Sequence, residues 1–149
     1  MKPLALIDTN VVIAAVAEAH AHHEPSLALF EAGPPGRFAV AAHSYAEAYA
    51  VLTSPAERAP FRWTPDTAWA ALASVAAATR LVGLSHSQLF DTVRSFAAER
   101  GVGARLYDRA IGEAAVQHDI PSIISWNVKH MRPLFPDLQV LSPADFLST

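Results

Sequence analysis

Four side chains that can bind a cation or position a phosphate interrupt otherwise apolar stretches of this chain. Asp8 ends the first apolar run, and Asn127 closely follows a later one. Glu47 and Asp108 lie in stretches whose apolar residues have helical spacing. An ionised carboxylate on a largely apolar element is costly unless it is paired or bound to a metal, so these positions need an explanation.

Each of these residues also has an ordinary structural explanation. Asp8 and Asp108 can each cap a following helix, since aspartate is a favoured N-cap, although Asn10 is also available as the first cap. Glu47 can lie on a solvated, Ala-rich helix face, and Asn127 can be a turn asparagine. Taken one at a time, these residues leave both explanations open.

Five short apolar runs alternate with helical stretches and predict the elements that position these side chains. The predicted strands are Leu4–Asp8, Phe38–Ala42, Arg80–Leu84, Ser122–Ser125 and Leu138–Leu141. The predicted helices run from Asn10 toward the histidines at 20, 22 and 23, over Pro25–Phe30, from His43 or Ser44 to about Thr53, over Pro65–Ala77 and Ser87–Glu99, from near Asp108, and after Ser142-Pro143. This alternation predicts one α/β domain over residues 1–149, with a central, mostly parallel sheet of about five strands and helices on both faces.

The same pattern brings the polar side chains together. In open α/β sheets the ligand crevice lies beyond the carboxyl ends of the strands, where Asp8 and Asn127 stand. The helices that carry Glu47 and Asp108 can lean over that crevice. Three carboxylates at one place raise each other's pKa values, and a divalent cation removes the conflict. Because the chain has no cysteine, oxygen-only ligation favours Mg²⁺ or Mn²⁺.

Composition limits the remaining possibilities. The chain has 149 residues, of which 52% are hydrophobic, and a net charge of −3. No segment is long and apolar enough to span a bilayer, and Asp8 interrupts the only run that resembles a secretory signal. The absence of cysteine agrees with a reducing cytoplasm. The negative charge argues against an overtly basic nucleic-acid binder, so any contact with RNA needs a local cationic patch.

Several other side chains have both a functional and a structural interpretation. The candidates for phosphate or RNA contacts are Thr9, Arg105, Arg109 and Lys129, each of which can equally be a helix cap or solvated surface. The histidines at 20, 22 and 23 fit a solvated helix end better than a metal site. Trp126 can stack on a base but is more typical of a core residue beside a strand end. The aromatic residues at 61, 63 and 69 can form a surface for a protein partner. They can equally attach the segment with Pro55 and Pro60, which separates two predicted helices, to the rest of the domain.

In order and context these pieces resemble the PIN-domain ribonucleases, specifically the VapC-type toxins of type II toxin–antitoxin pairs. Ile7-Asp8-Thr9-Asn10 resembles the opening strand and first acidic residue of that family, and Ala46-Glu47 resembles its second acidic position. The glycine-led stretch from Gly101 to Asp108 resembles the approach to the third. Ile124–Met131, which contains Asn127, resembles the last motif, and the resemblance covers nearly the whole chain.

The resemblance implies a growth-inhibiting endoribonuclease that hydrolyses RNA phosphodiester bonds. Asp8, Glu47 and Asp108 would ligate Mg²⁺ or Mn²⁺, and Asn127 would complete the catalytic set. The resemblance also implies neutralisation by a cognate antitoxin protein, a cytoplasmic location and a homodimer. Many relatives carry an aspartate in place of Asn127, so the choice between one and two metal ions stays open.

Two alternatives belong to other functional classes. Asp8 can be the covalent phosphoacceptor of an aspartyl-phosphate phosphatase or receiver module. Asn10 then stands where the aspartyl phosphatases have a second acid. The other alternative is a catalytically silent interaction protein with the same fold.

Overall fold

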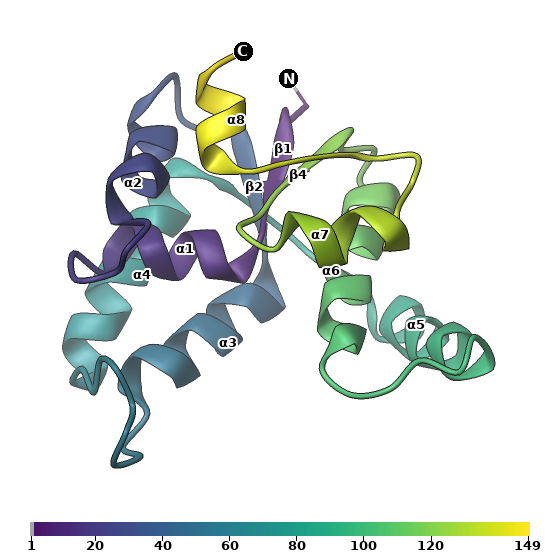
Figure 1. The fold of residues 1–149 in the computed structure, drawn as a ribbon, viewed down its shortest axis with the longest axis horizontal. Coiled ribbons are helices and arrows are strands. Elements are labelled where there is room, and N and C mark those ends of the chain that lie inside the picture. The colour runs from purple at the N-terminus through teal and green to yellow at the C-terminus, as the bar shows by residue number, and fades with distance from the viewer. Residues whose placement is uncertain (1) are drawn as a thin grey trace.

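Five parallel strands form the centre of the fold, which a computed structural model describes for residues 2–149 (Figure 1). The strands are β1 (Ala5–Ile7), β2 (Phe38–Ala41), β3 (Arg80–Val82), β4 (Ser122–Ile124) and β5 (Gln139–Leu141). Their order in the sheet is β3-β2-β1-β4-β5, and every pairing is parallel. The predicted sheet is confirmed, and its central strands β1 and β4 lie side by side.

The helices connect these strands and cover both faces of the sheet. In the described residues they are α1 (Thr9–Val16), α2 (His23–Glu31), α3 (Ala42–Thr53), α4 (Pro65–Ala78), α5 (His86–Ala98), α6 (Arg105–Gln117), α7 (Val128–Met131), the 3-10 helix η1 (Arg132–Leu134) and α8 (Pro143–Leu147). The Thr64 side chain caps α4 as predicted, by accepting a hydrogen bond from the Thr67 backbone N–H. None of these helices is both long enough and apolar enough to cross a membrane.

The structure differs from the predicted helices in three details. Of the two possible caps of α1, Asp8 and not Asn10 is the N-cap; Asn10 lies within that helix, and its side chain bonds to Ser125 at the β4 end. Helix α6 begins at Arg105 rather than near Asp108, because the Gly103 carbonyl already accepts the Leu106 N–H at 3.2 Å. The short α7, which follows Asn127, was not predicted.

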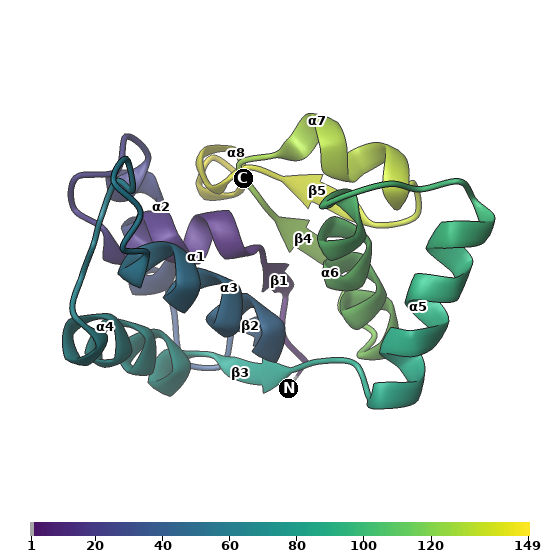
Figure 2. The same ribbon diagram turned by 90° about the horizontal axis from the view of Figure 1, so that it is seen from below.

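Side chains that alternate along the strands fill two cores. Ala5 and Ile7 belong to a core shared with α1–α4, whereas Leu6 and Ile123 belong to a core shared with α6 and α7. Figure 2 shows α1–α4 on one side of the sheet and α5 and α6 on the other, with α5 outside α6. The two helical layers therefore meet the sheet from opposite faces, and both reach the edge where the strands end.

Candidate active site

Asp8 and Asn127 lie near each other because they follow the carboxyl ends of the adjacent strands β1 and β4. Asp8 follows β1 directly, and its backbone N–H donates to the Ile124 carbonyl of β4 at 2.9 Å. Ser125, Trp126 and Asn127 then leave β4 at the same edge. The predicted neighbourhood of Asp8 and Asn127 thus follows from the parallel pairing of two adjacent strands.

Asp8 is held rigidly at this edge. One of its carboxylate oxygens accepts the Thr9 N–H at 2.7 Å, and the other accepts the Ser125 hydroxyl at 2.7 Å. The Asn10 amide also donates to the second oxygen, at 3.4 Å. Only 5% of the Asp8 surface is exposed. Asp8 is therefore both the cap of α1 and a fixed acidic group, so its two sequence interpretations are compatible.

A small polar network ties the loop after β4 to this carboxylate. The Ser125 hydroxyl oxygen accepts the Asn127 N–H at 2.9 Å and the Asn10 amide at 3.3 Å. The Asn10 side-chain oxygen Oδ1 accepts the Trp126 backbone N–H at 3.1 Å. Ser125 is completely buried. Its role was not predicted, because it depends on the pairing of two strands that lie more than a hundred residues apart.

An open cleft lies between α3, α6 and α7. We call it the α3–α6–α7 cleft; its volume is about 420 Å³, and it is lined by Glu47, Ala104, Arg105, Tyr107, Asp108, Asn127 and His130. Three of the four predicted catalytic residues therefore share one cleft. Asp8 is buried and does not line it, but its charge acts on Glu47, and the charge of Asp108 acts on both.

The three carboxyl groups disfavour full ionisation. Burial raises the pKa of Asp8 from 3.8 to about 6, against the opposing effect of its hydrogen bonds from Ser125 and Thr9. Burial also raises the pKa of Glu47, and the charges of Asp8 and Asp108 raise it further. The pKa of Asp108 is likewise raised by burial, although the nearby charges of Arg105 and His130 act in the opposite direction. The neighbouring positive charges therefore do not offset the cost of ionising all three carboxyl groups.

Several buried polar atoms around Glu47 have no hydrogen-bond partner in the described part of the chain. On α3 they include Glu47 Oε1, His43 Nε2 and Ser44 Oγ; Thr9 Oγ1 on α1 and Arg109 Nε on α6 are also unpartnered. His43 Nε2 and Glu47 Oε1 lie 3.6 Å apart, and burial lowers the pKa of His43, which favours its neutral form. Buried polar groups in proteins are normally satisfied, so this concentration of unpartnered atoms points to a ligand.

The residues present fit a hard divalent cation by their chemistry. Asp8, Glu47 and Asp108 provide carboxylate oxygens, which Mg²⁺ and Mn²⁺ prefer. As they stand in residues 2–149, no three His, Asp or Glu side chains are close enough to share one ion. The carboxylates on α3 and α6 would have to converge toward Asp8 for that. The unpartnered Oε1 of Glu47 has no competing bond to break in doing so.

The four residues predicted to contact phosphate lie in different places in the structure. Arg105 lines the cleft, and Lys129 is exposed on the neighbouring α7. Thr9 is buried. Arg109 instead pairs with Glu99, with 2.6 Å between Nη2 and Oε2, and only 15% of its side chain is exposed. The structure therefore brings Arg105 to the cleft but not Arg109.

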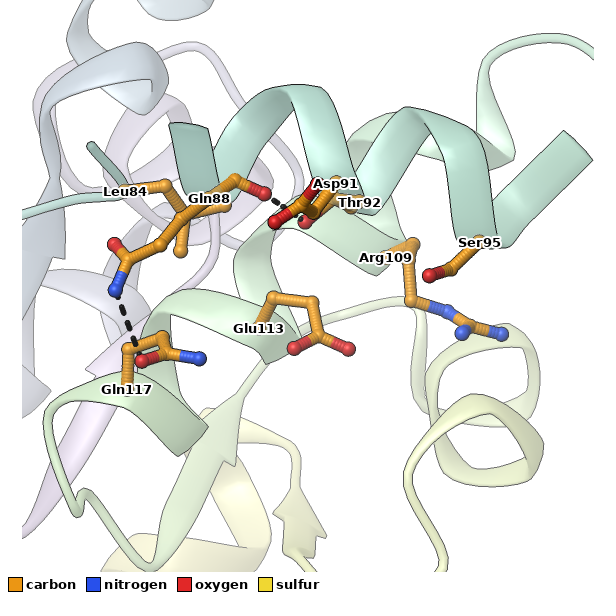
Figure 3. Close-up of a pocket in the computed structure, with 8 residues that line it drawn as sticks. All are labelled: Leu84, Gln88, Asp91, Thr92, Ser95, Arg109, Glu113 and Gln117. Carbon is orange, nitrogen blue, oxygen red and sulfur yellow. Dashed lines mark hydrogen bonds between the residues drawn. The ribbon is translucent and has the colours of Figure 1, made fainter. Parts of the chain in front are cut away.

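Arg109 faces a second polar cavity between α5 and α6 (Figure 3). This α5–α6 pocket has a volume of about 130 Å³ and is lined by Leu84, Gln88, Asp91, Thr92, Ser95, Arg109, Glu113 and Gln117. Its polar groups bond to one another: the Gln88 amide donates to Gln117 Oε1 at 2.9 Å, and the Thr92 hydroxyl donates to the Gln88 carbonyl at 2.9 Å.

The Trp126 ring and the histidine cluster serve the fold. Trp126 stacks on His22 with 3.9 Å between ring centroids, and its indole N–H donates to Ser26 at 2.8 Å. His23 Nδ1 lies 2.8 Å from the Ala14 carbonyl oxygen. These contacts attach the start of α2 to α1 and to the loop after β4.

The chain belongs to the PIN-domain family: the family model for the PIN domain matches residues 5–129, which include Asp8, Glu47, Asp108 and Asn127. Beyond the matched part, β5 pairs with β4 and so completes the same sheet. No curated protein matches the chain significantly by sequence.

Solved structures share the fold at low sequence identity. VapC20 of Mycobacterium tuberculosis, described as a Sarcin-Ricin loop cleaving toxin, is 15% identical with a TM-score of 0.62, over 80% of this chain and 86% of that one. VapBC-1 of nontypeable Haemophilus influenzae is 14% identical with a TM-score of 0.63, over 94% and 98%. FitAcB of Neisseria gonorrhoeae is 16% identical with a TM-score of 0.60, over 94% and 98%.

Proposed function

We propose that this protein is a Mg²⁺- or Mn²⁺-dependent endoribonuclease that acts in the cytoplasm as the growth-inhibiting toxin of a toxin–antitoxin pair. One observation carries the proposal: Asp8, Glu47 and Asp108 act on one another's charge at the carboxyl edge of the sheet. The buried and unpartnered Glu47 Oε1 adds to it. A cation bound by these three groups would offset their mutual repulsion and give Glu47 Oε1 a partner.

In this scheme the chain's own residues position the reacting groups. Asp8, Glu47 and Asp108 would hold the cation, which supplies a Lewis acid for the phosphodiester and a lowered pKa for a water molecule. The Ser125 hydroxyl and Thr9 N–H orient Asp8. Asn127 also lines the cleft, and its side-chain amide would bind a phosphate oxygen or a water.

A covalent phosphoacceptor role for Asp8 has less support. A phosphoacceptor needs an accessible carboxylate oxygen, whereas Asp8 is 5% exposed and both of its oxygens accept hydrogen bonds. At the position of a second acid the chain has Asn10, whose side chain is bonded to Ser125 and to the Trp126 backbone.

The proposed protein partners are a cognate antitoxin and a second copy of the chain. VapC20, VapBC-1 and FitAcB share the fold, and VapC20 is described as a toxin. Co-purification with the product of any small gene found directly upstream, and sedimentation of the isolated chain, test the two partners separately.

RNA cleavage tests the enzymatic part. The purified chain is incubated with a mixed RNA pool, with Mg²⁺, with Mn²⁺ or with a chelator, alongside Asp8→Asn and Glu47→Gln. Glu113→Gln is the matched control, because it makes the same change at a carboxylate in the α5–α6 pocket. We expect metal-dependent cleavage that both site variants lose and the control keeps. Unchanged cleavage in both site variants would refute the assignment, and no cleavage by any form would favour a silent interaction protein.

A further inference from the structure

His43 and Glu47 turn two buried ligand atoms toward the same place on α3. Neither His43 Nε2 nor Glu47 Oε1 has a hydrogen-bond partner within residues 2–149, and both atoms are buried. The two residues lie four positions apart, a spacing that places side chains on the same face of a helix. The His43 side chain is 30% exposed, so it is the Nε2 end of its ring that is turned inward.

The separation of these two atoms suits a shared cation better than a direct hydrogen bond. His43 Nε2 and Glu47 Oε1 lie 3.6 Å apart. An N–H···O hydrogen bond in a protein is about 2.7–3.2 Å long. A divalent ion with metal–nitrogen and metal–oxygen bonds of about 2.1 Å can join ligand atoms that lie up to about 4.2 Å apart. The pair is therefore too far apart to satisfy itself and close enough to bind one ion.

We propose that His43 Nε2 and Glu47 Oε1 bind the same divalent cation, so that the metal site contains an imidazole nitrogen and favours first-row transition ions over Mg²⁺. The inference rests on the metal-dependent activity proposed above and adds a ligand and a preference among ions. Two metal ligands four residues apart on one helix face are a recurring arrangement, as in the two histidines of the H-E-x-x-H motif. Imidazole is a ligand of transition ions, whereas Mg²⁺ takes oxygen ligands.

A neutral imidazole also suits the charge of this group. Asp8 and Asp108 already raise the pKa of Glu47, so a further carboxylate would add to the repulsion. Neutral histidine adds a ligand without adding negative charge. No three His, Asp or Glu side chains in the described residues are close enough to share an ion, but His43 and Glu47 are, so this pair is a preformed part of the site.

Spectroscopy of the bound ion tests the nitrogen ligand directly. The full chain, without RNA, is loaded with Mn²⁺, and pulsed electron paramagnetic resonance detects the coupling of the ion to a directly bound nitrogen nucleus. Calorimetry measures the Kd of Mg²⁺ and of Co²⁺. The variants are His43→Gln, His130→Gln, which removes the histidine that lines the α3–α6–α7 cleft, and His86→Gln, an exposed control on α5. Thermal unfolding checks that each variant is folded.

We expect nitrogen coupling in the parent chain, in His130→Gln and in His86→Gln, and its loss in His43→Gln. In His43→Gln the Kd of Co²⁺ should rise by about tenfold or more, and that of Mg²⁺ by less than about threefold, because Mg²⁺ does not depend on a nitrogen ligand. Glutamine keeps an N–H that can donate to Glu47, so it would replace a histidine that only positions Glu47. Coupling that persists in His43→Gln, or an equal loss of affinity for both ions, would refute the inference.

The outcomes separate this inference from the proposed function. If the chain binds Mn²⁺ and cuts RNA but shows no nitrogen coupling, the His43 ligand is refuted and the nuclease stands. If the coupling depends on His43 but no RNA is cut, the His43 ligand stands and the nuclease is refuted. If no ion binds, both are refuted.

Discussion

Helix α6 separates two polar cavities of opposite character. In the α5–α6 pocket Gln88 bonds to Gln117 (Figure 3). Arg109 pairs with Glu99, and of its guanidinium only Nε is without a partner in the described residues. In the α3–α6–α7 cleft, Glu47 has a buried oxygen without a partner, and the acidic groups oppose one another's ionisation. Polar groups that satisfy each other stabilise packing, whereas unsatisfied groups indicate a ligand.

The contrast is sharpest between two consecutive residues. Asp108 lines the cleft and Arg109 lines the pocket, because successive residues of a helix point in different directions. The pocket therefore supplies a matched control, Glu113, for substitutions of the carboxylates that line the cleft.

The largest predicted effect is on activity in the cleft. Asp108→Asn should lower RNA cleavage by about 100-fold or more, since even residues that only support metal ligands contribute about 10- to 100-fold. Glu113→Gln, on the other face of α6, should change the rate less than about twofold. Initial rates on one labelled RNA measure both. Equal losses would mean that the two cavities do not differ as described.

The next effect is on stability and its pH dependence at Asp8. Raising the folded-state pKa from 3.8 to about 6 penalises the ionised form by about 3 kcal/mol. Because this folded pKa is raised, the stability of the parent chain should fall as pH rises through that window and stay lower above it.

Asp8→Asn removes this dependence. At neutral pH the variant should be more stable than the parent by up to about 3 kcal/mol, and below the unfolded-state pKa the two should converge. Urea unfolding at a series of pH values measures the difference. A variant that is less stable than the parent at every pH would show that the hydrogen bonds to Asp8 outweigh its burial.

A smaller effect is expected at Ser125. Ser125→Ala removes the hydroxyl that bonds Asp8 and Asn127, and the buried groups left without a partner should cost about 1–3 kcal/mol. Ser95→Ala makes the same change at an exposed position of the α5–α6 pocket and should be nearly neutral. Urea unfolding distinguishes them, and equal destabilisation would contradict the role given to Ser125.

The smallest effect is expected in the pocket. Glu99→Ala breaks the partly exposed ion pair with Arg109 and should destabilise the chain by about 1 kcal/mol or less, with no change in cleavage. Arg105→Ala should do the reverse, with cleavage reduced and stability kept. A loss of cleavage in Glu99→Ala would mean that the pocket also takes part in function.

The sequence predicted the sheet and most of the site because both depend on local patterns. An apolar run that ends in Asp8 predicts a strand followed by an acidic group, and parallel strands place such ends together. The positions of Glu47 and Asp108 on helices near this edge followed from the alternation of elements. The PIN-domain resemblance then linked positions that were each ambiguous alone.

What the sequence missed depends on contacts between distant segments. Ser125 and Asn10 bond across β1 and β4, and no spacing along the chain reveals that register. The direction of Arg109 depends on where α6 begins, and the Gly103 carbonyl starts it before Asp108. Arg109 was proposed as a phosphate contact because it lies next to Asp108 in the sequence, whereas its guanidinium pairs with Glu99.

Direct titration with Mn²⁺ tests the central claim, that the unsatisfied carboxylates of the cleft hold a divalent cation. Calorimetry would compare the parent chain with Glu47→Gln and with Glu113→Gln. We predict that the parent and Glu113→Gln bind Mn²⁺ alike and that Glu47→Gln binds at least about tenfold more weakly. Equal binding by the parent and Glu47→Gln, or no binding by the parent, would contradict the account.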